Sequence, residues 1–162
     1  MAKVRKINEI LTNEDQEYLG VIYEKTERNK RVLRAHTKYS EKQILRIAEV
    51  MLEYTIANTA VKRLNEELSE IQSLRQEAKQ KYENSRIKKE SNKYLKEYLG
   101  LTSKIKSLEE ERDYYSYDVQ RLENIAVEYD GIVNNALDRE EERQANKNKV
   151  SDPSRPNGPR NK

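Results

Sequence analysis

The fold is decided by residues 61–71, which read VKRLNEELSEI. Their apolar side chains, Val61, Leu64, Leu68 and Ile71, follow one another at alternate spacings of three and four residues. This spacing puts one apolar stripe on one face of a helix, and such a stripe must be buried against other helices. The segment therefore predicts a coiled coil or a helical bundle.

The same seven-residue repeat covers two long stretches, residues 47–82 and 98–136. Each stretch has one exception on its seam, Arg75 in the first and Arg112 in the second. A seam arginine is costly unless it meets a carboxylate or lies along the rim, and a seam tyrosine needs a partner for its hydroxyl. Such polar residues either fix the register and partner of the helices or extend out of a loose coil; both interpretations stay open.

The two repeats do not share one register. Extending the first repeat would place seam positions at 89 and 96, whereas the second repeat has one at 98. A continuous coiled coil absorbs insertions of three or four residues, and this shift of two fits neither. We therefore predict an antiparallel helical hairpin with a break near 83–97 and a turn near 84–92. A turn at Gly100 and an unbroken rod are the alternatives.

The sequence predicts three helix starts, and capping residues mark the first and the third. The first follows a loose lead-in over residues 1–12, the second belongs to a short helix around 29–36, and the third is at residue 41. The capping pairs are Thr12–Asp15 or Asn13–Gln16 for the first start and Ser40–Gln43, a capping box, for the third. Residues 44–61 are apolar on several faces, so we expect them to pack with the N-terminal helices and with residues 119–137.

The predicted fold is thus all-α and has three parts. These are a small N-terminal helical region over residues 1–40, a long coiled-coil or antiparallel hairpin over 41–143, and a disordered basic tail over 144–162. The tail is polar and contains all three prolines of the chain.

Composition limits the class of protein. Charged residues make up 38% of the chain and hydrophobic residues only 35%, which is typical of long helices. The absence of cysteine excludes disulfides and thiolate chemistry. No signal peptide or membrane span is recognisable, so we expect a soluble, intracellular protein of the cytoplasm without a membrane partner.

Catalysis fits the sequence poorly. His36 is the only histidine, and the four glycines are isolated, so neither a usual zinc site nor a phosphate loop is present. We expect His36 to lie exposed in a loop. The sequence therefore predicts no enzyme, no catalytic residue, no metal, no cofactor and no small-molecule substrate.

A basic cluster is the strongest functional signal. Between residues 25 and 46 the chain has eight lysines and arginines against Glu27 and Glu41, a local balance of 8 − 2 = +6, although the whole chain carries only +3. The cluster coincides with a pattern suited to a helix-turn-helix, with Leu33 in the first helix and Ile44 and Ile47 on the buried side of the second. The predicted nucleic-acid-binding residues are Lys30, Arg31, Arg34, Lys38, Lys42, Gln43 and Arg46. A basic helix face beside an acidic one, without a ligand, is the competing interpretation.

The seam supplies a second predicted surface. One hairpin offers a narrow core, so we expect the chain to form a homo-oligomer through its apolar positions. The predicted oligomerisation residues are Val61, Leu64, Leu68, Ile71, Ile105, Leu108, Val119, Leu122 and Val133.

A helix-turn-helix followed by a coiled-coil oligomerisation segment resembles the layout of bacteriophage small terminase subunits and of some transcription regulators. The resemblance is one of architecture alone. It implies a non-enzymatic protein that binds DNA or RNA through the basic cluster, as a regulator or a DNA-packaging or assembly factor. The alternative is a structural adaptor or assembly scaffold whose seam binds another protein without nucleic acid.

Overall fold

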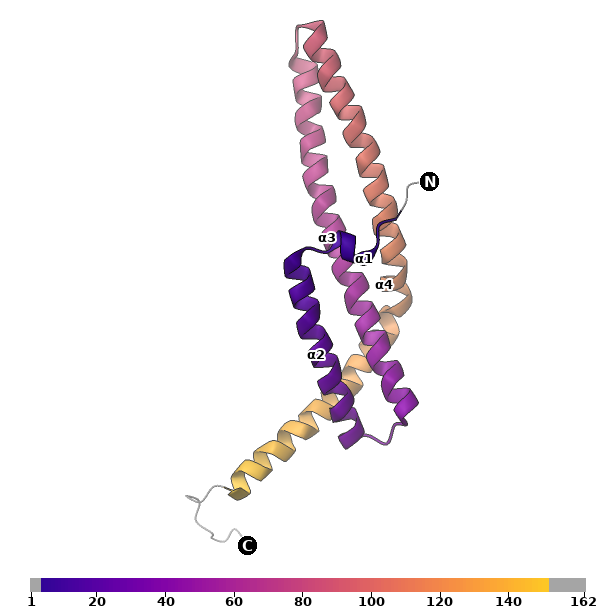
Figure 1. Ribbon diagram of the computed structural model, residues 1–162, viewed down its shortest axis with the longest axis vertical. Coiled ribbons are helices and arrows are strands. Elements are labelled where there is room, and N and C mark those ends of the chain that lie inside the picture. The colour runs from indigo at the N-terminus through magenta and orange to yellow at the C-terminus, as the bar shows by residue number, and fades with distance from the viewer. Residues whose placement is uncertain (1–3, 152–162) are drawn as a thin grey trace. The chain divides into compact units, whose positions relative to one another are not determined.

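The computed structural model describes residues 4–151, with side chains for residues 4–148, and this part of the chain forms four helices and no strand (Figure 1). The helices are α1 (Ile7–Ile10), α2 (Asn13–His36), α3 (Glu41–Asn84) and α4 (Lys88–Ser151). The prediction of an all-α fold is confirmed. The chain divides into two compact units. Unit 1 comprises the described residues up to Val21 together with Glu53–Glu123, and unit 2 comprises Ile22–Leu52 together with the described residues from Asn124 onward.

Local hydrogen bonds fix where α2 and α3 begin. The hydroxyl of Thr12 accepts a bond from the backbone N–H of Asp15, and the Asp15 carboxylate accepts one from the N–H of Thr12, both at 3.1 Å. Ser40 and Gln43 form the same reciprocal pair at 3.2 and 2.8 Å. These bonds satisfy backbone donors that a helix start leaves without partners. The separate short helix predicted around 29–36 is wrong, because α2 runs unbroken to His36.

Unit 1 is built on an antiparallel hairpin of α3 and α4 (Figure 1). The two helices are joined by residues 85–87, inside the predicted range of 84–92, and Leu64 and Leu68 of α3 are buried in one cluster with Ile105 and Leu108 of α4. The hairpin prediction is therefore confirmed, and the alternatives of a rod and of a turn at Gly100 are wrong. Gly100 lies inside α4.

The two seam arginines have neighbours within the hairpin. The guanidinium of Arg75 lies over the ring of Tyr98, with its central carbon 5.8 Å from the ring centroid. Arg112 is partly exposed and lies 3.4 Å from the carboxylate of Asp113. An arginine over an aromatic ring is stabilised by the ring's quadrupole, so Arg75 is accommodated by Tyr98 rather than by a carboxylate.

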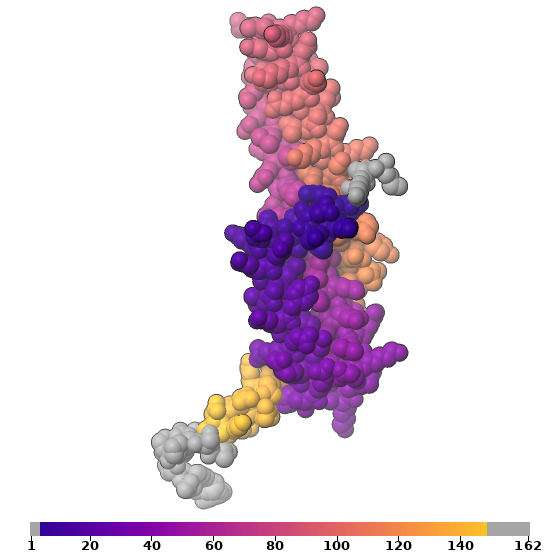
Figure 2. Space-filling model, in the orientation of Figure 1, coloured from indigo at the N-terminus to yellow at the C-terminus, as the bar shows by residue number. Residues whose placement is uncertain are grey.

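Residues 4–11, which we call the N-terminal strap, cross the hairpin in unit 1 (Figure 2). Ile10 of the strap is buried in the cluster of Leu64 and Leu108, and Leu11 is also buried. The guanidinium of Arg5 bonds the carboxylates of Glu67 on α3 and Glu111 on α4. The predicted loose lead-in over residues 1–12 is thus wrong for residues 4–12, because the strap has both an apolar anchor and an ionic one.

Unit 2 has a separate apolar core formed by three helices. Val32 and Leu33 come from α2, Ile44 and Ile47 from α3, and Val133 and Ala136 from α4. Leu33 and Ile44 are almost completely buried. This core confirms that the apolar start of the third helix packs with the N-terminal helices and with the second arm of the hairpin.

The packing does not follow the predicted boundaries at residues 40 and 143. Both α2 and α3 contribute to each unit, because a helix packs wherever its apolar stripe finds a neighbour, whatever its place in the chain. α4 continues to Ser151, so residues 144–151 are helical, although we predicted them to be disordered. The rest of the predicted tail, residues 152–162, lies outside the described residues. In the described part of the chain, no helix is both long and apolar enough to cross a membrane.

Candidate functional site

The predicted oligomerisation surface is occupied within a single chain. Six of its residues are buried, and the other three are partly buried. The buried ones are Leu64, Leu68, Ile105, Leu108, Leu122 and Val133, and the partly buried ones are Val61, Ile71 and Val119. We predicted self-association because one hairpin seemed too narrow to cover its own seam. Other segments of the same chain cover it instead, because Ile10 of the N-terminal strap and the α2 residues Val32 and Leu33 complete the two cores.

Both acidic residues of the basic cluster are paired with predicted site residues. Lys30 donates to the carboxylate of Glu27 at 2.9 Å, and the guanidinium of Arg34 forms a bidentate ion pair with Glu41. The hydrogen bond from Lys30 lowers the pKa of Glu27, and the hydrogen bond from Arg34 lowers the pKa of Glu41. Both carboxylates therefore stay ionised at neutral pH and neutralise one cation each.

Six cations of the cluster are left without an acidic partner among the described side chains. They are Lys25, Arg28, Arg31, Lys38, Lys42 and Arg46, and all six are exposed. Each of the two ion pairs joins one positive and one negative charge, so pairing leaves the net charge of residues 25–46 unchanged. The net charge of +6 is therefore carried by these six exposed side chains.

Three of these cations meet around the link between α2 and α3. Two open grooves adjoin there and share Tyr39, Gln43 and Ile132. The first, of about 490 Å³, also contains Lys38 and Arg139, and the second, of about 360 Å³, also contains Lys42 and Arg46. Among the described residues, Glu128 is the only acidic one that lines either groove. We call Lys38, Lys42, Arg46 and Arg139, with Tyr39 and Gln43, the basic corner.

Arg139 is held in this place by the end of α2. Its Nη1 donates to the backbone carbonyl of His36 at 2.8 Å, which satisfies an acceptor that the helix terminus leaves free. A cation is also favoured at a helix C-terminus by the helix dipole. The contact uses one donor of the guanidinium, so the charge of Arg139 remains available at the corner.

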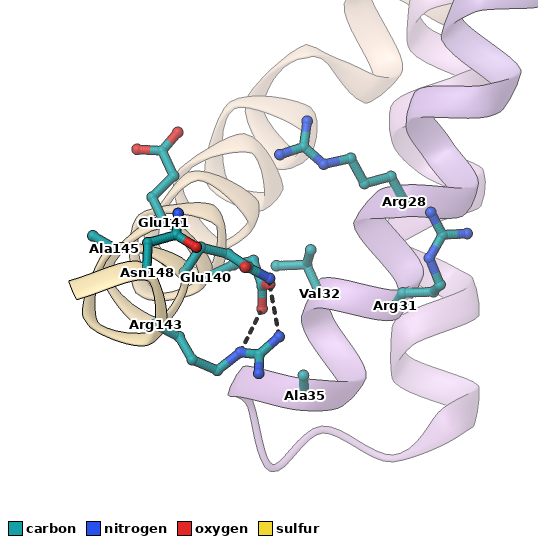
Figure 3. Close-up of a pocket in the computed structure, with 10 residues that line it drawn as sticks. Arg28, Arg31, Val32, Ala35, Glu140, Glu141, Arg143, Ala145 and Asn148 are labelled. Atoms are coloured by element: carbon teal, nitrogen blue, oxygen red, sulfur yellow. Dashed lines mark hydrogen bonds and ion pairs between the residues drawn. The ribbon is translucent and has the colours of Figure 1, made fainter. Parts of the chain in front are cut away.

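A larger groove of about 770 Å³ lies between α2 and α4 within unit 2 (Figure 3). Arg28 and Arg31 line it from α2, and Glu140 and Arg143 line it from α4. Figure 3 shows the ion pair of Arg143 with Glu140, whose atoms approach to 3.0 Å, and Arg28 extending from α2 toward α4. The charges lining this groove are mixed, so it is a weaker candidate for binding an anion than the basic corner.

His36 is not the exposed loop residue that we predicted. It is the last residue of α2, its side chain is 13% exposed, and its Nε2 lies 2.7 Å from the carboxylate of Glu140. The hydrogen bond from Arg143, followed by those from His36 and Gln144, lowers the pKa of Glu140 to about 2. His36 therefore ties the end of α2 to an ionised carboxylate on α4.

The structure brings together four of the seven predicted nucleic-acid-binding residues, Lys38, Lys42, Gln43 and Arg46. Arg31 lies at the larger groove, while Lys30 and Arg34 are engaged with carboxylates. Sequence reasoning missed Arg139, which is far from the cluster in the chain. The predicted antiparallel hairpin could have indicated this residue, because it brings the end of the second arm back to the start of the first.

The helix-turn-helix interpretation is only partly matched by the geometry. Leu33, Ile44 and Ile47 are buried together, as that interpretation requires. The first turn of α3, however, is engaged locally: Glu41 binds Arg34, and the side-chain oxygen of Gln43 accepts from the N–H of Ser40. A recognition helix contacts base edges with this turn, so two of its polar side chains are already committed.

Neither a metal site nor a similarity to known proteins points to a further functional site among the described residues. Within residues 4–148, no group of three or more histidine, aspartate or glutamate side chains is placed to hold a metal ion. Comparisons of this chain with protein-family models, curated proteins and solved structures find no match.

Proposed function

We propose that this protein is a non-enzymatic nucleic-acid-binding protein that contacts phosphates through the basic corner. The observation that carries the proposal is the gathering of Lys38, Lys42, Arg46 and Arg139 around two adjoining grooves that contain one acidic residue, Glu128. Three of these cations lie close together in the sequence, at the α2–α3 link and in α3, and the fold adds Arg139 from α4.

The charge of the corner is available for a ligand. Within the described side chains, Lys38, Lys42 and Arg46 make no ion pair, in contrast to Lys30 and Arg34. Long cationic side chains that face water without a carboxylate attract polyanions, and binding to nucleic acid releases the counterions condensed on its phosphates. Arg28 and Arg31 of the larger groove belong to the same unit and add two further exposed cations to it.

The test is the salt dependence of binding to a labelled mixed-sequence oligonucleotide, measured by fluorescence anisotropy. The slope of log K against log salt counts the phosphate contacts, at roughly 0.7 per contact for single strands and 0.9 for duplex. Replacing Lys38, Lys42 and Arg46 together with glutamine should therefore reduce the slope by roughly two to three and weaken binding at low salt.

Unit 1 offers a matched control. Glutamine at Arg86, Lys104 and Lys106 removes the same charge from exposed positions that make no ion pair within the described side chains. This control should keep the slope of the unchanged protein. Equal losses in both triple variants would mean that net charge, and not the corner, governs binding.

Failure of the intact protein to bind DNA or RNA at low salt would refute the proposal. The alternative of an adaptor that binds another protein through its seam would then need a different surface, because the buried leucines of that seam already pack within the chain. The basic corner would then be a docking surface for an acidic protein.

A further inference from the structure

We infer that the basic corner is built for a single-stranded nucleic acid, with Tyr39 as the platform on which a base stacks. This inference rests on the proposed function and specifies its ligand. It follows from the surroundings of Tyr39, from the engagement of the first turn of α3, and from the concave form of the corner.

Tyr39 has the position that a stacking residue needs. It lies in the link between α2 and α3, it lines both grooves of the basic corner, and 39% of its surface is exposed. Its ring is outside the apolar core of unit 2, which is made from Val32, Leu33 and the other buried residues of the three helices. A base that stacks on the exposed part of this ring would cover it.

The groups around Tyr39 match a backbone that passes over its ring. Lys38 and Arg139 lie in one groove beside the ring, and Lys42 and Arg46 lie in the other. Asn135 and the side-chain N–H groups of Gln43, whose oxygen accepts from Ser40, add neutral hydrogen-bonding groups to the first groove. Cations that flank an aromatic ring are the arrangement by which sequence-tolerant proteins hold single strands: phosphates meet the cations and a base meets the ring.

A duplex is the poorer ligand for the same surface. Its bases are stacked on one another and present no free face to Tyr39, so it could use only the cations. Reading the edges of its bases would require the first turn of α3, where Glu41 is paired with Arg34 and the side-chain oxygen of Gln43 accepts from the N–H of Ser40. The corner thus offers a duplex less than it offers a single strand.

The experiment compares three labelled 20-nucleotide ligands of the same mixed sequence: single-stranded DNA, single-stranded RNA and the DNA duplex. Fluorescence anisotropy would be measured at several salt concentrations for the unchanged protein and for Tyr39→Leu. Two controls accompany them, Tyr39→Phe, which keeps the ring, and Tyr117→Leu, which removes a tyrosine that is 67% exposed in unit 1. Helical content would be checked by circular dichroism for every variant.

We expect the single strands to bind more tightly than the duplex. Tyr39→Leu should weaken single-strand binding roughly tenfold, the loss typical of one stacked base, without changing the salt slope, since no phosphate contact is removed. Tyr39→Phe and Tyr117→Leu should bind like the unchanged protein. The DNA and RNA arms show whether the sugar matters.

Two outcomes would overturn the inference, and they differ in what else they remove. If the duplex binds as tightly as the single strands, or if Tyr39→Leu changes nothing, the inference of base stacking is wrong. The proposed function would still be supported in that case if binding depends on salt and is lost in the triple glutamine variant. If no ligand binds at low salt, the proposed function fails and the inference fails with it.

Discussion

Arg5→Met should destabilise the protein far more than a surface arginine substitution does. The guanidinium of Arg5 donates to both carboxylate oxygens of Glu111 at 2.8–3.0 Å and to Glu67 at 3.1 Å, and the backbone N–H of Arg5 adds a further bond to Glu111 at 2.8 Å. Glu111 is only 4% exposed. Methionine keeps the backbone bond and an unbranched apolar stem but leaves this buried carboxylate without its cation.

The expected loss follows from the burial of the pair. Removing one partner of a buried ion pair costs about 3–5 kcal/mol in general. Here the Arg5 side chain is 34% exposed and one backbone bond to Glu111 survives, so we expect about 2–3 kcal/mol. For a chain of this size that corresponds to a fall of roughly 4–12 °C in the melting temperature. Circular dichroism at 222 nm during heating measures it.

Two further variants isolate the interaction. Arg121→Met is the matched control, because Arg121 pairs with the exposed carboxylates of Glu53 and Asp118, and it should change stability by less than about 0.5 kcal/mol. Glu111→Gln combined with Arg5→Met should cost less than the sum of the two single losses, with a coupling of about 1–2 kcal/mol. A loss from Arg5→Met no larger than that of the control, or strictly additive losses, would refute the reasoning.

Three other predictions concern the hairpin and its buried carboxylate. Burial raises the pKa of Glu111, but the hydrogen bonds from Arg5 outweigh this effect, and the pKa is lowered overall. The contribution of Glu111 to the free energy of unfolding should therefore be complete above about pH 4.5 and be lost as the pH falls further. Glu111→Gln should flatten the acid side of the stability profile measured by urea unfolding. Leu68→Ala should cost on the order of 2–4 kcal/mol, whereas Leu74→Ala, at a position 47% exposed on the same helix, should cost less than about 1 kcal/mol; equal losses in urea would contradict the assignment of faces. Cysteines at Glu53 and Arg121, whose charged groups lie 3.8 Å apart, should be joined by a short bismaleimide within one chain, and a product of twice the monomer mass on a denaturing gel would indicate exchange of arms between chains.

The hairpin was predictable because its signals are periodic and local. The two-residue register shift required a break, and the apolar repeat identified Leu64, Leu68, Ile105 and Leu108 as seam residues, all of which are buried. Capping pairs likewise predicted the starts of α2 and α3 from four residues each. These features depend on contacts within one helix or on one repeated spacing, so the sequence alone carries them.

The N-terminal strap was not predictable by the same means. α1 has four residues, too few for a periodic pattern, and Arg5 of the strap is held by residues 62 and 106 positions away. Glu111 stands in a run of acidic residues, Glu109–Glu111, that looks like a solvated helix face. Only the placement of Arg5 beside it distinguishes the buried member of the run from its neighbours, and no spacing in the sequence records that placement.

The candidate site shows the same division between local and long-range information. The charge count over residues 25–46 found the cluster but could not tell that Lys30 and Arg34 are neutralised while Lys38, Lys42 and Arg46 are available. It also could not include Arg139, which reaches the corner only because α4 returns to the start of α3.

The buried seam and the exposed basic corner differ in what they can offer a binding partner. An apolar stripe that is already buried by its own chain has little free energy left to offer a partner, because that area has been removed from water on folding. The ionic groups at the corner differ in this respect, since Lys38, Lys42 and Arg46 are still hydrated and keep their charge free. Binding through them exchanges hydration and counterions for phosphates without disturbing either core. A function exerted through the basic corner is therefore compatible with the folded chain as it stands, whereas one exerted through the seam would first require the hairpin to open.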